Sequence, residues 1–108
     1  MQVPNPARLL RLHLSEHDRH KGRPLYEAIV TRCMELGIAG ATVFRGLEGY
    51  GETAALHRAG IMRHDQPIVV TIVDTAENVA RLIPEVEAMM HTGMIAWSDV
   101  EVIRVTRR

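Results

Sequence analysis

The sequence predicts an α+β domain with the element order βαββαβ, and three patterns carry this prediction. Leu10, Leu12 and Leu14 alternate with polar side chains, as in a strand with one buried face. In two later segments, apolar side chains recur at three- and four-residue steps, as in amphipathic helices. Between those segments, a β-branched run from Ile68 to Val73 is typical of a covered strand. We therefore expect two strand-helix-strand units in one chain.

The size and charge of the chain exclude several classes of protein. The 108 residues contain no linker, so we expect a single domain over residues 1–108, with a frayed end at residues 1–6, where two prolines occur. The 13 basic and 13 acidic side chains cancel, which argues against a nucleic acid as partner. No apolar run approaches the roughly 20 residues of a membrane span, and no signal sequence is visible, so we expect a cytoplasmic protein.

A polar connection and a helix follow the first strand. Residues 15–23 are mostly charged and lead to Pro24, a favoured residue in the first turn of a helix. Gly37 and Gly40 stand where such a helix would end. The lone Cys33 has no partner for an internal disulfide, and its helical spacing predicts a small buried core residue. The buried stripe of this helix is expected at Leu25, Ala28, Ile29, Cys33 and Leu36.

The middle of the chain predicts a second strand and a long loop. Residues 41–47 are rich in β-formers, and glycines at positions 46, 49 and 51 then free the backbone. The segment from Glu52 to Gln66 has no strand pattern, and loops of this length in small domains tend to be functional. Because it has a glycine entrance and mixed charges, we expect it to be mobile when empty and to become ordered on binding. An inert surface excursion is the alternative.

The last part of the chain predicts a strand from Pro67, a helix and a final strand. Asp74 and Glu77 have the spacing of a capping box, with Thr75 as an alternative cap. Pro84 lies inside the helical pattern and is expected to kink or split the helix. The buried stripe is expected at Val79, Leu82, Ile83, Val86, Met89 and Met90, and the last strand at Val100, Val102, Ile103 and Val105.

This order of elements is that of the ferredoxin-like fold, in which two helices cover one face of a four-stranded antiparallel sheet. The other face then has no layer of its own, and such a face commonly packs against a partner subunit. The residues expected on it are Arg11, His13, Val69, Thr71 and Val73.

No motif for an ordinary enzyme is present, since the chain has no nucleophile elbow, no His-Glu-x-x-His helix and no phosphate-binding Gly-x-x-x-x-Gly-Lys loop. Glu48 and Glu52 could form a carboxylate pair for acid–base chemistry, but surface glutamates near a loop are usually only solvated. We therefore expect a protein without catalytic residues.

Two long motifs resemble those of known families. Residues 21–30 read Lys-Gly-Arg-Pro-Leu-Tyr-Glu-Ala-Ile-Val, and residues 40–51 read Gly-Ala-Thr-Val-Phe-Arg-Gly-Leu-Glu-Gly-Tyr-Gly. Both are similar to recurrent patterns of the uncharacterised PII-like family catalogued as domain of unknown function 190. Residues 36–43 and 49–51 also resemble the Gly-Ile-x-Gly-Met-Thr-Val and Gly-Phe-Gly segments of PII nitrogen-regulatory signalling proteins. With further matches at residues 82–85 and 99–102, the resemblance covers nearly the whole chain.

The resemblance implies a signalling or regulatory protein that forms a homotrimer, with its sheets facing the threefold axis and ligand clefts between neighbours. It also implies that the segment from Glu52 to Gln66 is an effector loop that contacts a target protein, which could be a membrane protein. No cofactor or metal is implied; the expected ligand is a small anionic metabolite, such as an adenine nucleotide. The expected ligand residues are Arg45, Gly46, Gly49, Tyr50, Gly51, Thr92, Gly93 and Arg104.

Two departures from the PII pattern limit the number of phosphates that we expect the ligand to have. Glu52-Thr53-Ala54 replaces the Arg-Gln-Lys of PII proteins, and Ala96-Trp97-Ser98-Asp99 replaces their Gly-Asp-Gly-Lys. These changes remove the cations and backbone donors that hold a triphosphate, so we expect fewer phosphates, or another anion, bound by Arg45, Arg58 or Arg104.

A divalent-metal-binding role stays open as the alternative. The trimeric CutA family is similar in architecture, and metal binding here would use His57, His64 or the cluster Glu16, His17, Asp18 and His20. A purely structural interaction protein is the third reading.

Overall fold

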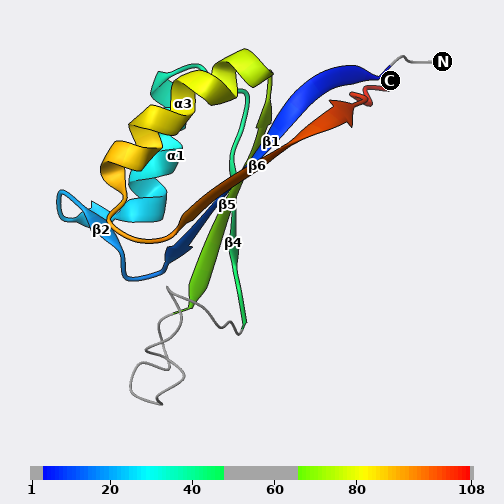
Figure 1. The fold of residues 1–108 in the computed structure, drawn as a ribbon. Coiled ribbons are helices and arrows are strands. Elements are labelled where there is room, and N and C mark those ends of the chain that lie inside the picture. Colours follow the sequence, from blue (N-terminus) through cyan, green and yellow to red (C-terminus); the bar gives the residue numbers. More distant parts are fainter. Residues whose placement is uncertain (1–3, 48–65, 108) are drawn as a thin grey trace.

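The computed structural model describes residues 4–47 and 66–107. The described helices pack on one side of a four-stranded sheet (Figure 1), which confirms the predicted ferredoxin-like fold. Within the described part of the chain, no helix is both long enough and apolar enough to cross a membrane. The elements are β1 (Asn5–Ser15), β2 (Arg19–His20), β3 (Arg23–Pro24), α1 (Leu25–Glu35), β4 (Thr42–Arg45), β5 (Pro67–Asp74), α3 (Ala76–Met89) and β6 (Met94–Val102).

The four long strands form one antiparallel sheet in the order β4-β5-β1-β6. Strand β1 lies inside the sheet, where Leu10 is opposite Ile72 of β5 and Trp97 of β6. The strand begins at Asn5, which pairs with Val102, so it already includes residues that the sequence pattern assigns to a frayed end. Strands β4 and β6 are the two edges of this sheet.

The core lies between the sheet and the helices. The three leucines of the β1 alternation are completely buried, as are Val79, Leu82 and Val86 of α3. Burying one such side chain stabilises the fold by about 2 kcal/mol relative to leaving it exposed. Cys33 of α1 is buried in the same cluster, as its spacing predicts. The helix-side positions of β5 complete the cluster with Ile68, Val70 and Ile72.

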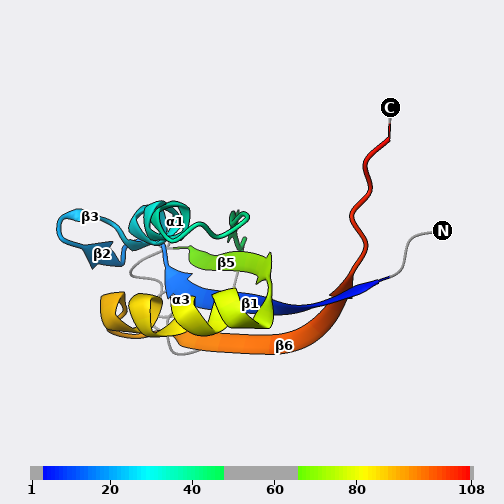
Figure 2. The same ribbon diagram turned by 90° about the horizontal axis from the view of Figure 1, so that it is seen from above.

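In the part of the chain that the structure describes, no helix covers the opposite side of the sheet, and we call this side the open face. Alternation along β1 and β5 puts there the five residues expected from the sequence, and the register adds Phe44 and Met94, which lie opposite Val69 and His13. Phe44 and Met94 are 54% and 55% exposed. The helices α1 and α3 lie side by side in Figure 2, and the residues after β6 lead away from them.

Two short strands replace the polar connection that was expected over residues 15–23. Strands β2 and β3 pair in a hairpin, with Arg19 opposite Pro24. Lys21 and Gly22 have φ angles of 51° and 82°, the left-handed conformation required by a tight two-residue hairpin turn. Strand formation was not visible in the sequence because neither strand exceeds two residues.

The structure of α3 corrects the prediction for Pro84 and shows which of the two expected residues caps the helix. Pro84 neither splits nor ends α3, which runs through it from Ala76 to Met89. Pro84 is exposed, as is Ala80, whose carbonyl loses its helical partner, so water can satisfy that carbonyl. The cap is Thr75, whose side chain accepts a hydrogen bond from the Asn78 amide at 3.1 Å.

The limits of the last strand were predicted wrongly. Strand β6 begins at Met94 and ends at Val102, so Ile103 and Val105 lie beyond it. The run Ala96-Trp97-Ser98-Asp99, which the PII comparison aligns with a phosphate loop, is the centre of this strand. Pairing with the long strand β1, rather than the local sequence, determines where β6 lies.

Candidate functional site

Residues at one end of the sheet form the candidate site. The register places Arg45, the last residue of β4, opposite Ile68 near the start of β5, and it places Met94, the first residue of β6, opposite His13 near the end of β1. The β4 exit and the β6 entrance therefore lie at the same end of the sheet. Four expected ligand residues flank these strand ends: Arg45, Gly46, Thr92 and Gly93.

Within one chain, these four residues form two separate groups. Strands β4 and β6 are opposite edges of the sheet, with β5 and β1 between them. Because neighbouring strands lie about 4.8 Å apart, roughly 14 Å separates the two groups. The backbones of the two groups therefore lie apart in one chain, although the Arg45 side chain extends from its own strand to the end of β1.

Arg45 is held by a carboxylate from the end of β1. Its Nη2 atom lies 3.1 Å from Oε2 of Glu16. The Arg45 side chain is 54% exposed and the Glu16 side chain 21%, so the guanidinium faces solvent while the carboxylate is largely enclosed. An exposed pair of this kind contributes roughly 0.2–1 kcal/mol. Arg45 therefore has a partner but remains accessible to an anion.

The other oxygen of Glu16 binds the residue that precedes β5. The Gln66 amide donates to Oε1 of Glu16 at 3.0 Å, and the Glu16 amide donates to the Gln66 carbonyl at 2.9 Å. When its amide nitrogen faces acceptors, the Gln66 side chain donates to the carbonyls of Gly46 and Leu47. Glu16 and Gln66 thus connect the end of β1 with the end of β4.

Gly46 has a packing role. Its amide donates to the Pro67 carbonyl at 2.7 Å, and a Cβ at position 46 would stand 2.8 Å from Cγ of Pro67. A side chain at this position would force the two strand ends apart.

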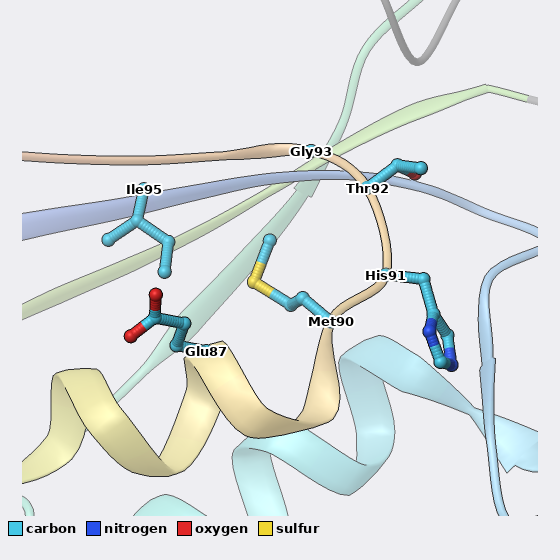
Figure 3. A pocket seen from close by; sticks show the side chains of 6 residues that line it. All are labelled: Glu87, Met90, His91, Thr92, Gly93 and Ile95. Atoms are coloured by element: carbon cyan, nitrogen blue, oxygen red, sulfur yellow. The ribbon is translucent and has the colours of Figure 1, made fainter.

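The second group borders an open pocket between the end of α3 and the start of β6. Its volume is about 280 Å³. Figure 3 shows the Met90 side chain in its middle, with Glu87 and Ile95 on one side and His91 on the other. The six lining residues are Glu87, Met90, His91, Thr92, Gly93 and Ile95.

Gly93 lets the chain turn from α3 into β6. Its φ angle is 117°, and a Cβ at this position would collide with the carbonyl oxygen of His13 and touch Cε of Met90 at 3.0 Å. Only glycine adopts this conformation so close to a backbone oxygen without strain. Gly93 is thus required by the fold itself.

Arg104 lies at the opposite end of the sheet, two residues after β6. Burial raises the pKa of the Asp74 carboxyl, but hydrogen bonds and the charge of Arg104 outweigh this effect and hold the pKa below its ordinary value. Strand β6 has nine residues, a length of about 30 Å. Within one chain, Arg104 therefore does not share a site with Thr92.

The carboxylates of the metal alternative have other partners. The two carboxylate oxygens of Glu16 contact the Arg45 side chain and the Gln66 amide. Oδ2 of Asp18 accepts a hydrogen bond from the Ser15 amide at 3.0 Å. Among residues 4–47 and 66–107, no three His, Cys, Asp or Glu side chains are grouped to hold a metal ion. Six expected site residues lie outside the described residues: Gly49, Tyr50, Gly51, His57, Arg58 and His64.

Sequence reasoning missed two contributors to the candidate site. Glu16 was considered only as a metal ligand, although it directly follows β1 and is two residues from Leu14, the last leucine of the alternation. Met90 packs partly buried against the core, as expected, and it also lines the open pocket.

Sequence comparison finds one family that matches nearly the whole chain. The family model DUF190, described as Uncharacterized ACR, matches residues 7–102. A UPF0166 protein of Aquifex aeolicus is 40% identical over 98 residues, covering 89% of this chain and 92% of that protein. A UPF0166 protein of Methanocaldococcus jannaschii is 30% identical over 103 residues, covering 91% and 93%.

Structure comparison finds PII-like proteins with the same fold. The structure of CPII, a nitrogen regulatory PII-like protein from Thiomonas intermedia K12, bound to ADP, AMP and bicarbonate, is similar with a TM-score of 0.63 and 23% identity; the match covers 94% of this chain and 96% of that chain. The apo form of CPII has a TM-score of 0.68 at 19% identity, covering 95% and 98%.

Proposed function

Since the chain belongs to the DUF190 family, which matches it over residues 7–102, we propose that it is a PII-like regulatory protein that senses a small anionic metabolite. It acts by binding, without catalysis of its own. The similarity in fold to a nitrogen regulatory PII-like protein supports this class of function.

The proposed assembly is a homotrimer whose subunits pack through their open faces. Phe44, Val69 and His13 form a row across this face, and Phe44 is 54% exposed in the single chain. Packing against other subunits would remove this apolar surface from water, at about 25 cal/mol for each Å² buried. Cyclic assembly repeats the same contact around the axis.

The observation that carries the proposed site is the separation of its two halves. Arg45 with Gly46 and Thr92 with Gly93 lie at one end of the sheet but on opposite edges. In a cyclic assembly, the β4 edge of one subunit can approach the β6 edge of the next, and Arg45 then supplies positive charge beside the Thr92-Gly93 turn. The ligand lies between subunits.

The proposed ligand class is an adenine nucleotide with one or two phosphates. CPII, which shares the fold, has been solved with ADP and AMP bound. Here, the run from Ala96 to Asp99 lies in β6 and carries no cation, so positive charge for phosphates is limited to arginines such as Arg45. A target protein contacted through the segment from Glu52 to Gln66 remains part of the proposal.

Calorimetric titration with AMP, ADP and ATP tests the proposal. We expect AMP or ADP to bind, and Arg45→Ala to weaken binding about tenfold by removing a charge-assisted hydrogen bond. Arg107→Ala, at the far end of the sheet, is the matched control and should bind as the parent does. Absence of binding by all three nucleotides would reject the ligand class, and unchanged binding by Arg45→Ala would reject the role of Arg45.

A further inference from the structure

Glu16 forms an ion pair with Arg45, the expected ligand residue at the end of β4. Its Oε2 atom lies 3.1 Å from Nη2 of Arg45, and its Oε1 accepts the Gln66 amide at 3.0 Å. Both oxygens of one carboxylate are thus engaged, one by a side chain that is expected to bind an anion. This arrangement gives Glu16 an influence on the anion site that the sequence pattern alone does not indicate.

The backbone keeps the carboxylate in place. The Glu16 amide donates to the Gln66 carbonyl at 2.9 Å, which continues the β1–β5 ladder by one pair. Its side chain is only 21% exposed. If the Arg45 side chain turned away, the hydrogen bond from the Gln66 amide would still keep the Glu16 carboxylate in its place.

We propose that Glu16 is an internal competitor that lowers the affinity of the site for anions by occupying Arg45. This inference rests on the proposed function. An arriving phosphate must displace the carboxylate from the guanidinium or share the guanidinium with it. The carboxylate is part of the same chain, so it competes at a high effective concentration. It also repels a phosphate that comes to lie within a few ångströms.

The size of the effect follows from the exposure of the pair. An ion pair with one exposed partner has a modest strength, which corresponds to a change in affinity of about two- to fivefold. Glu16→Gln removes the charge but keeps an oxygen that can accept the Gln66 amide. We therefore expect Glu16→Gln to bind AMP about two- to fivefold more tightly than the parent.

The experiment compares four variants by calorimetry with AMP and with inorganic phosphate. They are Glu16→Gln, Glu35→Gln, Arg45→Ala and the double variant Glu16→Gln/Arg45→Ala. Glu35 is the matched control because it also forms a short contact with an arginine, Arg32, at 2.9 Å, but lies on α1. We expect Glu16→Gln to gain affinity, Glu35→Gln to be unchanged, and the gain to vanish when Arg45 is absent.

A second readout does not depend on nucleotide binding. The NMR signal of the Arg45 Nε–H group should shift on addition of inorganic phosphate at lower concentrations in Glu16→Gln than in the parent. Should Glu16→Gln fold poorly, Glu16→Asp, which shortens the side chain by one methylene and so lengthens the contact with Arg45, is expected to show a smaller shift in the same direction.

The outcomes separate this inference from the proposed function. If the parent binds AMP and Glu16→Gln binds it equally or more weakly, competition by Glu16 is rejected while the nucleotide proposal stands. If no protein binds AMP, ADP or ATP, the nucleotide proposal is rejected, and the phosphate titration of the Arg45 signal still decides whether Glu16 competes. A gain in affinity that persists without Arg45 would overturn the inference, because it would act through another group.

Discussion

The carboxylate of Asp74, the last residue of β5, accepts a hydrogen bond from the backbone amide of Ala39 at 2.9 Å. Ala39 belongs to the connection between α1 and β4, so this contact joins segments 35 residues apart. The same side chain accepts hydrogen bonds from the Thr75 amide at 2.7 Å and from Nδ2 of Asn78 at 2.9 Å. One carboxylate therefore connects the start of α3 to the chain that leads into the edge strand β4.

Replacing this carboxylate should destabilise the fold. We expect Asp74→Ala to lower the free energy of unfolding by about 2 kcal/mol, because three donors lose a charged acceptor. Urea denaturation would measure the change. Asp99→Asn is the control: Asp99 pairs with Arg8 at 3.0 Å, but its side chain is 80% exposed, and we expect a change below about 0.5 kcal/mol. Equal stability of Asp74→Ala and the parent would contradict the role of the carboxylate.

The same group predicts a dependence of stability on pH. Burial raises the pKa of Asp74. Its hydrogen bonds with Ala39, Asn78 and Thr75 and the charge of Arg104 together lower the pKa by more, so it lies below its ordinary value. A carboxyl with a depressed pKa stabilises the fold above its unfolded pKa of about 3.9, and this contribution is lost as the pH falls through the folded pKa. The parent should therefore lose more stability than Asp74→Asn between about pH 5 and pH 2. Parallel stability curves for the two proteins would refute this.

Replacement by alanine should destabilise the fold strongly at Gly93 and hardly at Gly40. At position 93, a Cβ would collide with the His13 carbonyl, and the alanine backbone would have to adopt a φ of 117°. We therefore expect Gly93→Ala to lower the free energy of unfolding by about 2–4 kcal/mol. At Gly40, nothing lies within 4 Å of an added Cβ, and we expect Gly40→Ala to change the stability by less than about 1 kcal/mol. Thermal denaturation of both variants is the measurement. A stable Gly93→Ala would show that the turn into β6 can rearrange.

Cys33 should be unreactive in the folded protein. Burial raises the pKa of its thiol to about 11, so very little thiolate exists at pH 8. Labelling with a thiol reagent should be at least about a hundredfold slower than for a free thiol with a pKa of about 8.5, and denaturant should remove the difference. Since the folded state holds the proton more tightly, the stability of the parent should fall as the pH rises from about 8.5 toward the folded value of about 11, and Cys33→Ala should lack this decline. Rapid labelling without denaturant would place the thiol at the surface.

The trimer proposal predicts different effects for two exposed apolar residues. Phe44 lies on the open face and is 54% exposed, whereas Met34 on α1 is 73% exposed. We expect Phe44→Lys to break the assembly, because each subunit would bury a charge at the interface, and Met34→Lys to leave it intact. Light scattering should give three times the 12.1 kDa chain mass for the parent and for Met34→Lys. A parent with the mass of one chain would reject the trimer, and a trimeric Phe44→Lys would exclude Phe44 from the interface.

The parts of the fold that were predictable are those with strong periodic patterns. The leucine alternation of β1 and the helical stripe of α3 each report burial on one side, and burial on one side determines the layer arrangement. In β6, by contrast, Met94 and Ala96 on one side alternate with Ile95 and Trp97 on the other, so both sides are apolar and no alternation is visible. Its limits depend on pairing with β1, which lies at the other end of the sequence.

The candidate site was predictable only in part, for a similar reason. Arg45 and Thr92 were selected because of their places in motifs, and the structure brings their strand ends to one end of the sheet. The contact of Arg45 with Glu16 depends on the register between β1, β5 and β4, which no local pattern encodes. The pocket beside Met90 likewise depends on where α3 ends relative to β6.

The place of β1 inside the sheet also has a consequence for how the chain is made on the ribosome. Its neighbours are β5 and β6, so Asn5 meets Val102 only after the ribosome has synthesised all of β6. Until then, one side of a long apolar strand has unpaired amides and carbonyls, the kind of edge that promotes aggregation. Contacts between such distant residues also slow folding. A nascent chain that stops before β6 would therefore be the species most in need of a chaperone.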